Sequence, residues 1–351
     1  MPLSRARQRS RQVLLSLLGL ACALAFVSPS QASAPPESLW QSLNGPPGPV
    51  TLLTMDERQP DHLWVVTAAQ TWRGGDRVQR VQAGQWRRAQ AIYRTIDGGV
   101  TWAPAGNGLP YGEITALAYD AVSAKLYVGL VGGGEQLARS QGLFRSSDGG
   151  ATWQQVNLAP AYRQIRVLAI VRSADGASVF VGAAETTRYP RSYVYRSEDN
   201  GVTWQEFQAL EYGQSPGSII TGLVPDPLVG ERLYLPTYGA LFFSEDAGQT
   251  WRESALPFCR EGRKAVVVEE DSVLAGRVYV TCALDGPVPQ TQLLRSDDGA
   301  RTWQQLSHPP LPGQARGMAV LPGTPSTLLL ATDRGLYRSG NGGRSWTDLG
   351  S

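Results

Sequence analysis

Five aspartates and one asparagine recur along the chain, separated by 51, 51, 47, 52 and 43 residues. Carboxylates in such a series could hold calcium or perform acid–base chemistry. Each one, however, lies in the same local string, with turn residues after it and a tryptophan five positions later. Because an aspartate accepts hydrogen bonds from the backbone N–H groups of the turn that it opens, we interpret the set as structural turn caps. Its members are Asp97, Asp148, Asp199, Asp246, Asp298 and Asn341.

The clearest copy of the string is SSDGGATW, which ends at Trp153. An apolar run precedes it, so the string predicts the turn of a β-hairpin. Gly149 and Gly150 can adopt positive φ without a Cβ clash. Thr152 is expected to start the return strand, and Trp153 gives that strand a large apolar anchor.

A period of about 50 residues with strand content indicates a propeller or a solenoid. Each repeat contains four candidate strands. In the second repeat these are Ile114–Tyr119, Lys125–Leu130, Gly142–Ser146 and Thr152–Val156, and the fourth repeat begins with Ile219–Val224. First strands are almost continuously apolar, as expected near a propeller axis. The sequence therefore predicts an all-β fold, a six-bladed β-propeller of four-stranded blades.

The recurring string resembles the Asp-box, or BNR repeat. Sialidases, sortilin-type receptors, xyloglucanases and the exported photosystem II assembly-factor propellers contain it. The resemblance runs from about Leu39 to Gly350 and implies a propeller with Asp-box turns, but says almost nothing about function. Ala300 replaces a glycine in the fifth copy and Asn341 replaces the aspartate in the sixth, so we expect those two turns to be looser.

One short segment has no place in the six repeats. Leu39-Trp40-Gln41-Ser42-Leu43 resembles a fourth strand without the three strands that should precede it. We expect it to pair near the closure between the first and last blades.

The N-terminus has the pattern of a secretory signal peptide. Arginines 5, 7, 9 and 11 precede the apolar run Val13–Val27, and Ala32-Ser33-Ala34 offers a cleavage site. We therefore predict a signal peptide over 1–34 and one propeller domain over 35–351. The predicted destination is the periplasm, the extracellular space or the thylakoid lumen. Lipidation of Cys22 is disfavoured because the apolar run continues past that cysteine, and anchoring by an uncleaved signal is disfavoured because the run is shorter than a membrane span of ~20 residues.

After removal of the leader two cysteines remain, which is an even number in an exported chain. Cys259 lies in the loop that enters the fifth blade, and Cys282 lies near the end of its second strand. Both points fall on one face of an up-and-down blade, so we predict a disulfide. The alternative is two buried free thiols.

Several classes of function find no support in the sequence. The formal net charge of +2 gives no general attraction to nucleic acid. His62 and His308 are far apart and show no metal-ligand spacing. No glycine-rich motif joins a strand to a helix, so we predict no cofactor and no metal.

Catalysis also lacks recognisable residues. The Arg-Ile-Pro motif of sialidases is absent, and Glu211-Tyr212 lies in a loop between blades. Xyloglucanases with this repeat place their carboxylates on two facing propellers, whereas this chain has residues for one. We therefore predict that the protein is not an enzyme. The alternative is a glycoside hydrolase or carbohydrate-binding protein of the sialidase or xyloglucanase class.

The variable loops supply the main functional signal. They join second to third strands and successive blades, so they share the face opposite the Asp-box turns, and they are rich in arginine and tryptophan, which favour protein interfaces. The candidate partner-binding residues are Trp72, Arg73, Arg77, Arg80, Trp86, Arg87, Arg88, Arg139, Arg188 and Arg191. By resemblance to the assembly-factor propellers we predict a protein-binding scaffold, with a membrane-protein complex as one kind of partner. Carbohydrate remains open as a ligand, and a solvated arginine-rich surface is the alternative.

Overall fold

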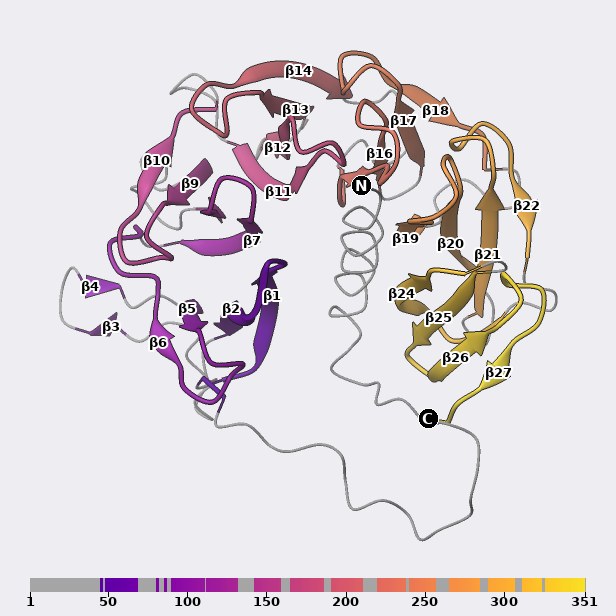
Figure 1. The fold of residues 1–351 in the computed structure, drawn as a ribbon, viewed down its shortest axis with the longest axis horizontal. Coiled ribbons are helices and arrows are strands. Elements are labelled where there is room, and N and C mark those ends of the chain that lie inside the picture. Colours follow the sequence, from indigo (N-terminus) through magenta and orange to yellow (C-terminus); the bar gives the residue numbers. More distant parts are fainter. Residues whose placement is uncertain are drawn as a thin grey trace, which may run out of the picture.

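The computed structural model describes residues 45–46, 48–68, 80–81, 85–86, 90–110, 112–131, 142–158, 165–185, 191–210, 220–237, 240–256, 265–284, 290–306, 311–323 and 326–350. These residues form six four-stranded antiparallel sheets arranged around a common axis (Figure 1). The predicted six-bladed, all-β propeller is confirmed. In this described part of the chain, no helix is long and apolar enough to cross a membrane.

The blades follow one another in chain order, with the first strand of each nearest the axis (Figure 1). Blade 1 consists of β1 (Val50–Asp56), β2 (Gln59–Ala68), β5 (Gln90–Thr95) and β6 (Ala103–Pro104). Blade 2 consists of β7 (Glu113–Asp120), β8 (Lys125–Val131), β9 (Gly142–Ser146) and β10 (Gln154–Val156). Blade 3 consists of β11 (Ile165–Arg172), β12 (Val179–Glu185), β13 (Ser192–Ser197) and β14 (Gln205–Leu210). Blade 4 consists of β15 (Val224–Pro225), β16 (Leu233–Pro236), β17 (Leu241–Ser244) and β18 (Arg252–Ser254). Blade 5 consists of β19 (Ala265–Glu270), β20 (Val278–Leu284), β21 (Gln290–Ser296) and β22 (Gln304–Gln305). Blade 6 consists of β24 (Ala315–Leu321), β25 (Thr327–Thr332), β26 (Gly335–Ser339) and β27 (Thr347–Asp348). A separate hairpin consists of β3 (Arg80–Val81) and β4 (Gln85–Trp86), and β23 (Leu311–Pro312) pairs with β21.

Two strands differ from the prediction. The fourth strand of blade 2, β10, begins at Gln154 rather than at Thr152, because Asp148 holds Thr152 in the turn. The first strand of blade 4 is reduced to Val224–Pro225, with one isolated bridge between Ile220 and Thr237 before it. The Thr221 N–H donates to the carbonyl of Pro236 on the neighbouring strand, but Pro236 has no N–H to return a bond, which accounts for the late start of this strand.

The recurring aspartates sit inside their own turns. The Oδ1 atom of Asp148 accepts hydrogen bonds from the Thr152 N–H at 2.9 Å and the Ser146 hydroxyl at 2.7 Å. Its Oδ2 atom accepts the Thr152 hydroxyl at 2.5 Å, while the Gly150 N–H donates to Ser146 Oγ at 2.8 Å. The same bonds recur around Asp97, Asp199, Asp246 and Asp298. Each box therefore ties the third strand of its blade to the fourth.

The two atypical boxes keep these bonds. Ala300 adopts a φ of 70° where Gly150 has 101°, and its N–H still donates to Ser296 Oγ at 2.9 Å. Asn341 Oδ1 accepts the Ser345 N–H at 2.9 Å, and its Nδ2 donates to Ser345 Oγ at 2.8 Å. The expected loosening of these turns is not seen.

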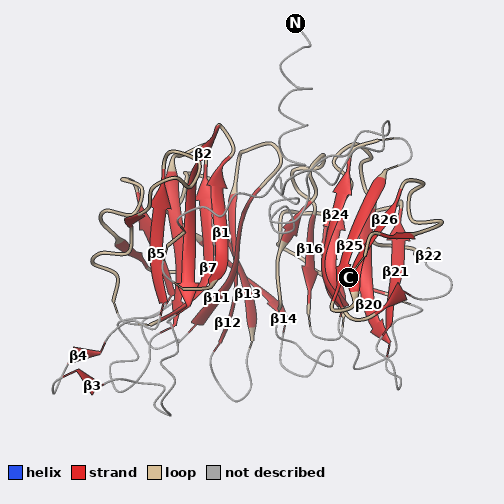
Figure 2. Cartoon of the chain, turned by 90° about the horizontal axis from the view of Figure 1, so that it is seen from below, coloured by secondary structure: helices blue, strands red, loops and turns tan. Residues whose placement is uncertain are grey.

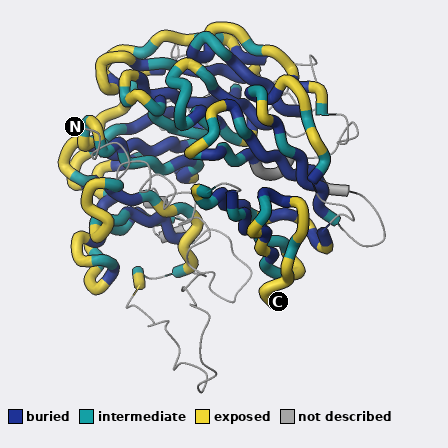
Figure 3. Tube along the Cα trace, turned by 45° about the vertical axis from the view of Figure 1, so that its right-hand side comes forward, coloured by how far each residue is buried: buried dark blue, intermediate teal, exposed yellow. Residues whose placement is uncertain are grey.

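The core is divided among the interfaces between consecutive blades. Five apolar clusters join blades 1–2, 2–3, 3–4, 4–5 and 5–6. Burial is concentrated along the strands, while the turns at the rim are exposed (Figure 3). Trp64 illustrates the packing: it is 1% exposed, stacks on Tyr119 of blade 2 and donates to the Gly149 carbonyl at 2.9 Å.

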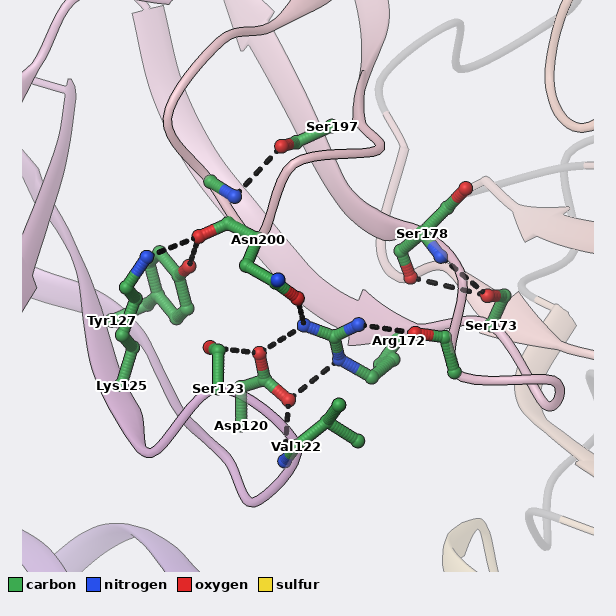
Figure 4. A network of polar contacts seen from close by, with 12 residues as sticks. Asp120, Val122, Ser123, Lys125, Tyr127, Arg172, Ser173, Ser178, Ser197 and Asn200 are labelled. Carbon is green, nitrogen blue, oxygen red and sulfur yellow. Dashed lines mark hydrogen bonds and ion pairs between the residues drawn. The ribbon is translucent and has the colours of Figure 1, made fainter.

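Polar bonds also join blades at the end that carries the boxes. Asp120, which ends β7, forms an ion pair with Arg172, which ends β11 (Figure 4). Arg172 also donates to Asn200 Oδ1 at 3.0 Å and to the Gly176 carbonyl at 2.5 Å. Because Asp120 also accepts the Val122 N–H at 3.0 Å, one carboxylate caps a turn and joins blades 2 and 3.

These bonds favour the ionised form of the box carboxylates. The hydrogen bonds that Thr101 donates lower the pKa of Asp97 to about 2. Partial burial opposes the shift at Asp298, yet the bonds from Thr302 hold its pKa at about 2 as well. Since the folded pKa lies below the unfolded value, the boxes stabilise the fold above about pH 4, and this contribution is lost as the pH falls toward 2.

We expect Asp298→Ala to lower the free energy of unfolding at pH 7 by about 1–3 kcal/mol, because the Thr302 N–H and hydroxyl lose their acceptor. Asp298→Asn should cost less, since Asn341 keeps the equivalent bonds in the sixth box. Urea unfolding at pH 7 and at pH 3 measures both effects, and the difference between wild type and Asp298→Asn should shrink at pH 3. Equal losses for the two variants at pH 7 would contradict the capping role.

Candidate functional site on the loop face

The two ends of the propeller differ in their connections. The turns between first and second strands and the box turns share one end, here called the box face. The connections between second and third strands and between blades share the other end, the loop face. The longest connection leaves blade 1 there and includes the β3–β4 hairpin, which projects beyond the blades (Figure 2). The loop face is therefore the variable side of a rigid scaffold, where binding residues concentrate.

The structure describes only some of the predicted partner-binding residues. Arg80 and Trp86 lie opposite each other on the paired strands β3 and β4. Arg191 lies just before β13 and is exposed. The others lie outside the described residues and stay predictions: Trp72, Arg73, Arg77, Arg87, Arg88, Arg139 and Arg188.

Cys282 lies on β20 with no exposed surface and is disulfide-bonded. Its predicted partner, Cys259, lies outside the described residues, so the pairing itself stays a prediction.

A carboxylate sits at the base of the loop in blade 3. Glu185 ends β12, and its Oε1 atom accepts the hydroxyl of Tyr193 at 2.9 Å. Its Oε2 atom accepts the Arg191 N–H at 3.4 Å, and its own N–H donates to the Arg191 carbonyl at 2.9 Å. Both carboxylate oxygens are thus used to hold the loop base, which favours a structural role.

A second carboxylate lies in the tight turn between β25 and β26 of blade 6. Asp333 Oδ1 accepts the Gln314 N–H at 2.8 Å, and the Asp333 N–H donates to the Gln314 carbonyl at 3.0 Å. Oδ2 lies 3.6 Å from the guanidinium of Arg316, whose side chain is 63% exposed, against 34% for Asp333. Asp333 therefore combines a fixed position with a side chain that is one-third exposed, next to an exposed cation.

Sequence reasoning missed Asp333. Its signal is the string Thr-Asp-Arg-Gly between two apolar strands of blade 6, where blades 1, 2, 3 and 5 carry longer insertions. A turn this short cannot fold over the loop face, so the Asp333 side chain stays partly exposed. The backbone beside it is equally constrained: Gly313 has a φ of 85°, and a Cβ there would lie 2.5 Å from Asp333 Oδ1.

Carboxyl groups with raised pKa lie at the opposite end. Burial raises the pKa of Glu270, the last residue of β19, to about 7, and burial together with Glu270 raises that of Glu269. Burial and the neighbouring Asp56 similarly raise the pKa of Glu57, directly after β1. Since first strands run from the loop face to the box face, these three glutamates cannot join Asp333 in one site. Across the described ranges, no group of three metal-ligating side chains is found.

Comparison with known proteins gives one curated relative of this propeller. A xyloglucanase from Paenibacillus sp. is 27% identical over 333 residues, which is 86% of this chain and 26% of the xyloglucanase. The chain thus spans about a quarter of that enzyme's length. No family model matches the sequence.

Solved structures share the fold. An ancestral GH74 enzyme superposes with a TM-score of 0.64 at 17% identity, over 89% of this chain and 40% of that one. YCF48 bound to D1 peptide superposes with a TM-score of 0.52 at 17% identity, over 88% of this chain and 83% of that one. Propellers of both kinds therefore have this architecture.

The prediction that the protein is not an enzyme is contradicted by the xyloglucanase relative, which matches most of the chain. That prediction depended on the absence of sialidase motifs and on the length of the chain. Neither criterion considers an isolated carboxylate such as Asp333, whose accessibility depends on the length of its turn.

We expect Gly313→Ala to destabilise the fold and displace Asp333, because the added methyl group meets Asp333 Oδ1 at 2.5 Å and Thr332 Oγ1 at 2.7 Å. The matched control is Gly108→Ala: Gly108 has a φ of 83°, but its Cβ would meet nothing within 4 Å. Both variants carry the left-handed strain of about 1 kcal/mol, so the excess loss of stability in Gly313→Ala isolates the crowding. Thermal unfolding measures the difference, and equal melting temperatures would show that the Asp333 corner is not rigid.

Proposed function

We propose that this propeller acts on xyloglucan, or a closely related β-glucan, through its loop face. The observation that carries the proposal is the 27% identity to a xyloglucanase over 86% of the chain. Because the chain spans a quarter of that enzyme, glycan binding and hydrolysis are separate parts of the proposal. The first needs only the loop face, and the second needs two carboxyl groups across the bound glycan.

The loop face has groups suited to sugar. Trp72 and Trp86 lie in the insertion of blade 1, and an indole offers both an apolar face for a sugar ring and an N–H donor. The β3–β4 hairpin, which lies within this insertion, projects beyond the blades (Figure 2). A long glycan can therefore lie along the loop face with the insertion at its side.

Asp333 is the carboxylate that we assign to the chemistry. Its backbone contacts with Gln314 fix its position, and Oδ2 is engaged only at the longer distance of 3.6 Å by Arg316. Glu185 is a weaker candidate, since Tyr193 and the Arg191 N–H occupy its two oxygens. A carboxylate at this position could serve as a general base or as a nucleophile.

The test measures binding to xyloglucan by affinity electrophoresis and hydrolysis by release of reducing ends. Wild-type protein should bind, and Trp72→Ala with Trp86→Ala should weaken binding at least tenfold. Asp333→Asn should bind normally but hydrolyse about 100-fold more slowly, the usual effect of removing an acid–base group. Asp297→Asn is the matched control on the box face, since Asp297 is 49% exposed and also pairs with arginines.

The outcomes separate the two parts. Binding without hydrolysis supports the glycan-binding role and overturns the assignment of Asp333. Absence of binding overturns the proposal as a whole.

A second candidate is recognition of a peptide by the arginines of the loop face. The solved YCF48 complex with D1 peptide favours it, because this chain matches 83% of that protein, whereas it matches only 40% of the GH74 enzyme. Arginine forks bind carboxylates in pairs of hydrogen bonds and therefore suit an acidic peptide.

We expect the double variant Arg87→Gln with Arg88→Gln to bind a fluorescent acidic peptide much more weakly than the wild type. The binding that remains should depend less on salt concentration. Arg252→Gln with Arg344→Gln, two exposed arginines elsewhere on the blades, provides a control with the same change of charge. Fluorescence anisotropy at two salt concentrations measures both pairs. If the two double variants bind equally, the arginines of the insertion do not form the peptide site.

A further inference from the structure

Four asparagines of the chain are followed directly by glycine; they are Asn44, Asn107, Asn200 and Asn341. This dipeptide is prone to spontaneous deamidation, because a glycine has no Cβ to hinder the attack of its backbone nitrogen on the asparagine side chain. Asn44 lies outside the described residues. The other three share the same pair of residue types, so differences between them must come mainly from the surrounding structure.

In the sixth box, hydrogen bonds hold the atoms that would react. The Gly342 N–H donates to the Ser326 carbonyl at 3.0 Å. Asn341 Oδ1 accepts the Ser345 N–H at 2.9 Å, and its Nδ2 donates to Ser345 Oγ at 2.8 Å. The attacking nitrogen and the side-chain amide are both engaged, so deamidation of Asn341 would require this turn to open first.

The third box restrains its pair in the same way (Figure 4). The Gly201 N–H donates to Ser197 Oγ at 2.7 Å. Asn200 Oδ1 accepts the Arg172 guanidinium at 3.0 Å, and the Asn200 carbonyl accepts the Tyr127 hydroxyl at 3.2 Å. Asn200 is nevertheless exposed, so exposure alone does not decide which pair can react.

The pair Asn107-Gly108 has none of these restraints. It occupies the centre of a turn between β6 and β7, which the Leu109 N–H closes by donating to the Gly106 carbonyl at 3.4 Å. Both residues of the pair are exposed, and within the described part of the chain neither forms a hydrogen bond. A Cβ on Gly108 would meet nothing within 4 Å. The Gly108 nitrogen can therefore approach the Asn107 side chain by rotation within an exposed turn, without the loss of a hydrogen bond of either residue.

We propose that Asn107 is a site of spontaneous deamidation in the folded protein, whereas Asn200 and Asn341 are protected. The Gly108 nitrogen forms a bond to Cγ of Asn107, and the bond from Cγ to the side-chain nitrogen breaks. The Gly108 amide proton leaves with that nitrogen as ammonia, and a cyclic succinimide remains. Solvent water then opens one of the two imide bonds, which gives aspartate or isoaspartate and adds a negative charge.

The two products should affect the fold differently. Ala105 and Leu109, on either side of the pair, are 3% and 8% exposed, and both belong to the apolar cluster that joins blades 1 and 2. Aspartate changes only an exposed side chain, whereas isoaspartate inserts one further carbon into the backbone between these two anchored residues. We therefore expect isoaspartate at position 107 to weaken the interface between blades 1 and 2.

Peptide mapping by mass spectrometry tests the modification in the purified full chain, incubated in mildly alkaline buffer. Conversion is measured at each asparagine as the mass difference between an acid and an amide. In the folded protein Asn107 should convert at least about tenfold faster than Asn200 and Asn341, because only those two need a local opening. In urea that unfolds the chain, the three should convert at similar rates. Equal rates in the folded protein, or a difference that persists in urea, would overturn the proposal.

Two variants test the physical cause. Ser197→Ala removes the acceptor of the Gly201 N–H, so Asn200 should convert at least about tenfold faster while Asn107 is unchanged. Gly108→Ala should slow conversion of Asn107 strongly, because its Cβ hinders the attack while the open space lets the turn form. Unchanged rates in both variants would overturn the assigned cause. If either variant fails to fold, the comparison of folded and urea-unfolded wild type still decides.

Thermal unfolding of the incubated protein measures the effect on the fold. A sample enriched in isoaspartate by chromatography should melt below fresh protein. Asn107→Asp is the matched control, since it adds the charge without the extra backbone carbon, and it should melt with fresh protein. Equal melting temperatures of all three would overturn the expected effect on the interface between blades 1 and 2.

Discussion

Capping of the box turn is the interaction on which this propeller depends. One carboxylate or amide and one hydroxyl bind the turn that joins the third strand to the short fourth strand. In blade 2, the Asp148 and Ser146 side chains hold the Thr152 and Gly150 N–H groups. Fourth strands here contain as few as two residues, too short to be stable by their own ladder. The cap therefore places the tryptophan, and the tryptophan builds the interface with the preceding blade.

This dependence gives the assembly a direction. Blades 2 to 6 each supply a tryptophan to the interface with the preceding blade, and blades 1, 2, 4 and 5 supply a smaller side chain, three residues after the tryptophan, to the interface with the next blade. Asp120 and Arg172 add a polar bond between blades 2 and 3, and Ser326 and Asp271 do the same between blades 6 and 5. The first and last blades of such a series present different side chains to each other. The contact between blade 6 and blade 1 therefore differs from the five contacts between consecutive blades.

The box face and the loop face differ in how much their connections vary from blade to blade. The boxes use the polar groups of their turns internally, as Asp148 and Ser146 do in blade 2. The loop face begins from the same strands but ends in connections of different length, so each blade can present different groups. Xyloglucanase and YCF48 propellers share this scaffold, which is why the fold by itself cannot distinguish a glycan from a peptide as the ligand.

The sequence alone determined the number of blades and their strands, because the box is a local motif whose donors and acceptors lie within eight residues. Its prediction that the first strands are buried was wrong for β1 and β7, where many positions are exposed or half-buried, whereas the second strands β8, β12 and β16 are almost entirely buried. A second strand has a strand on each side and a blade against each face, which apolar periodicity alone does not show. Only the tertiary structure showed that Asp333 is fixed by Gln314 while its side chain stays partly exposed, because these contacts join the turn to a residue 19 positions earlier. The exposure of Leu53 and Leu349 is likewise invisible in the sequence, where both resemble their buried counterparts. Burial depends on which blade lies beside a residue, and that is decided by the arrangement of the whole ring.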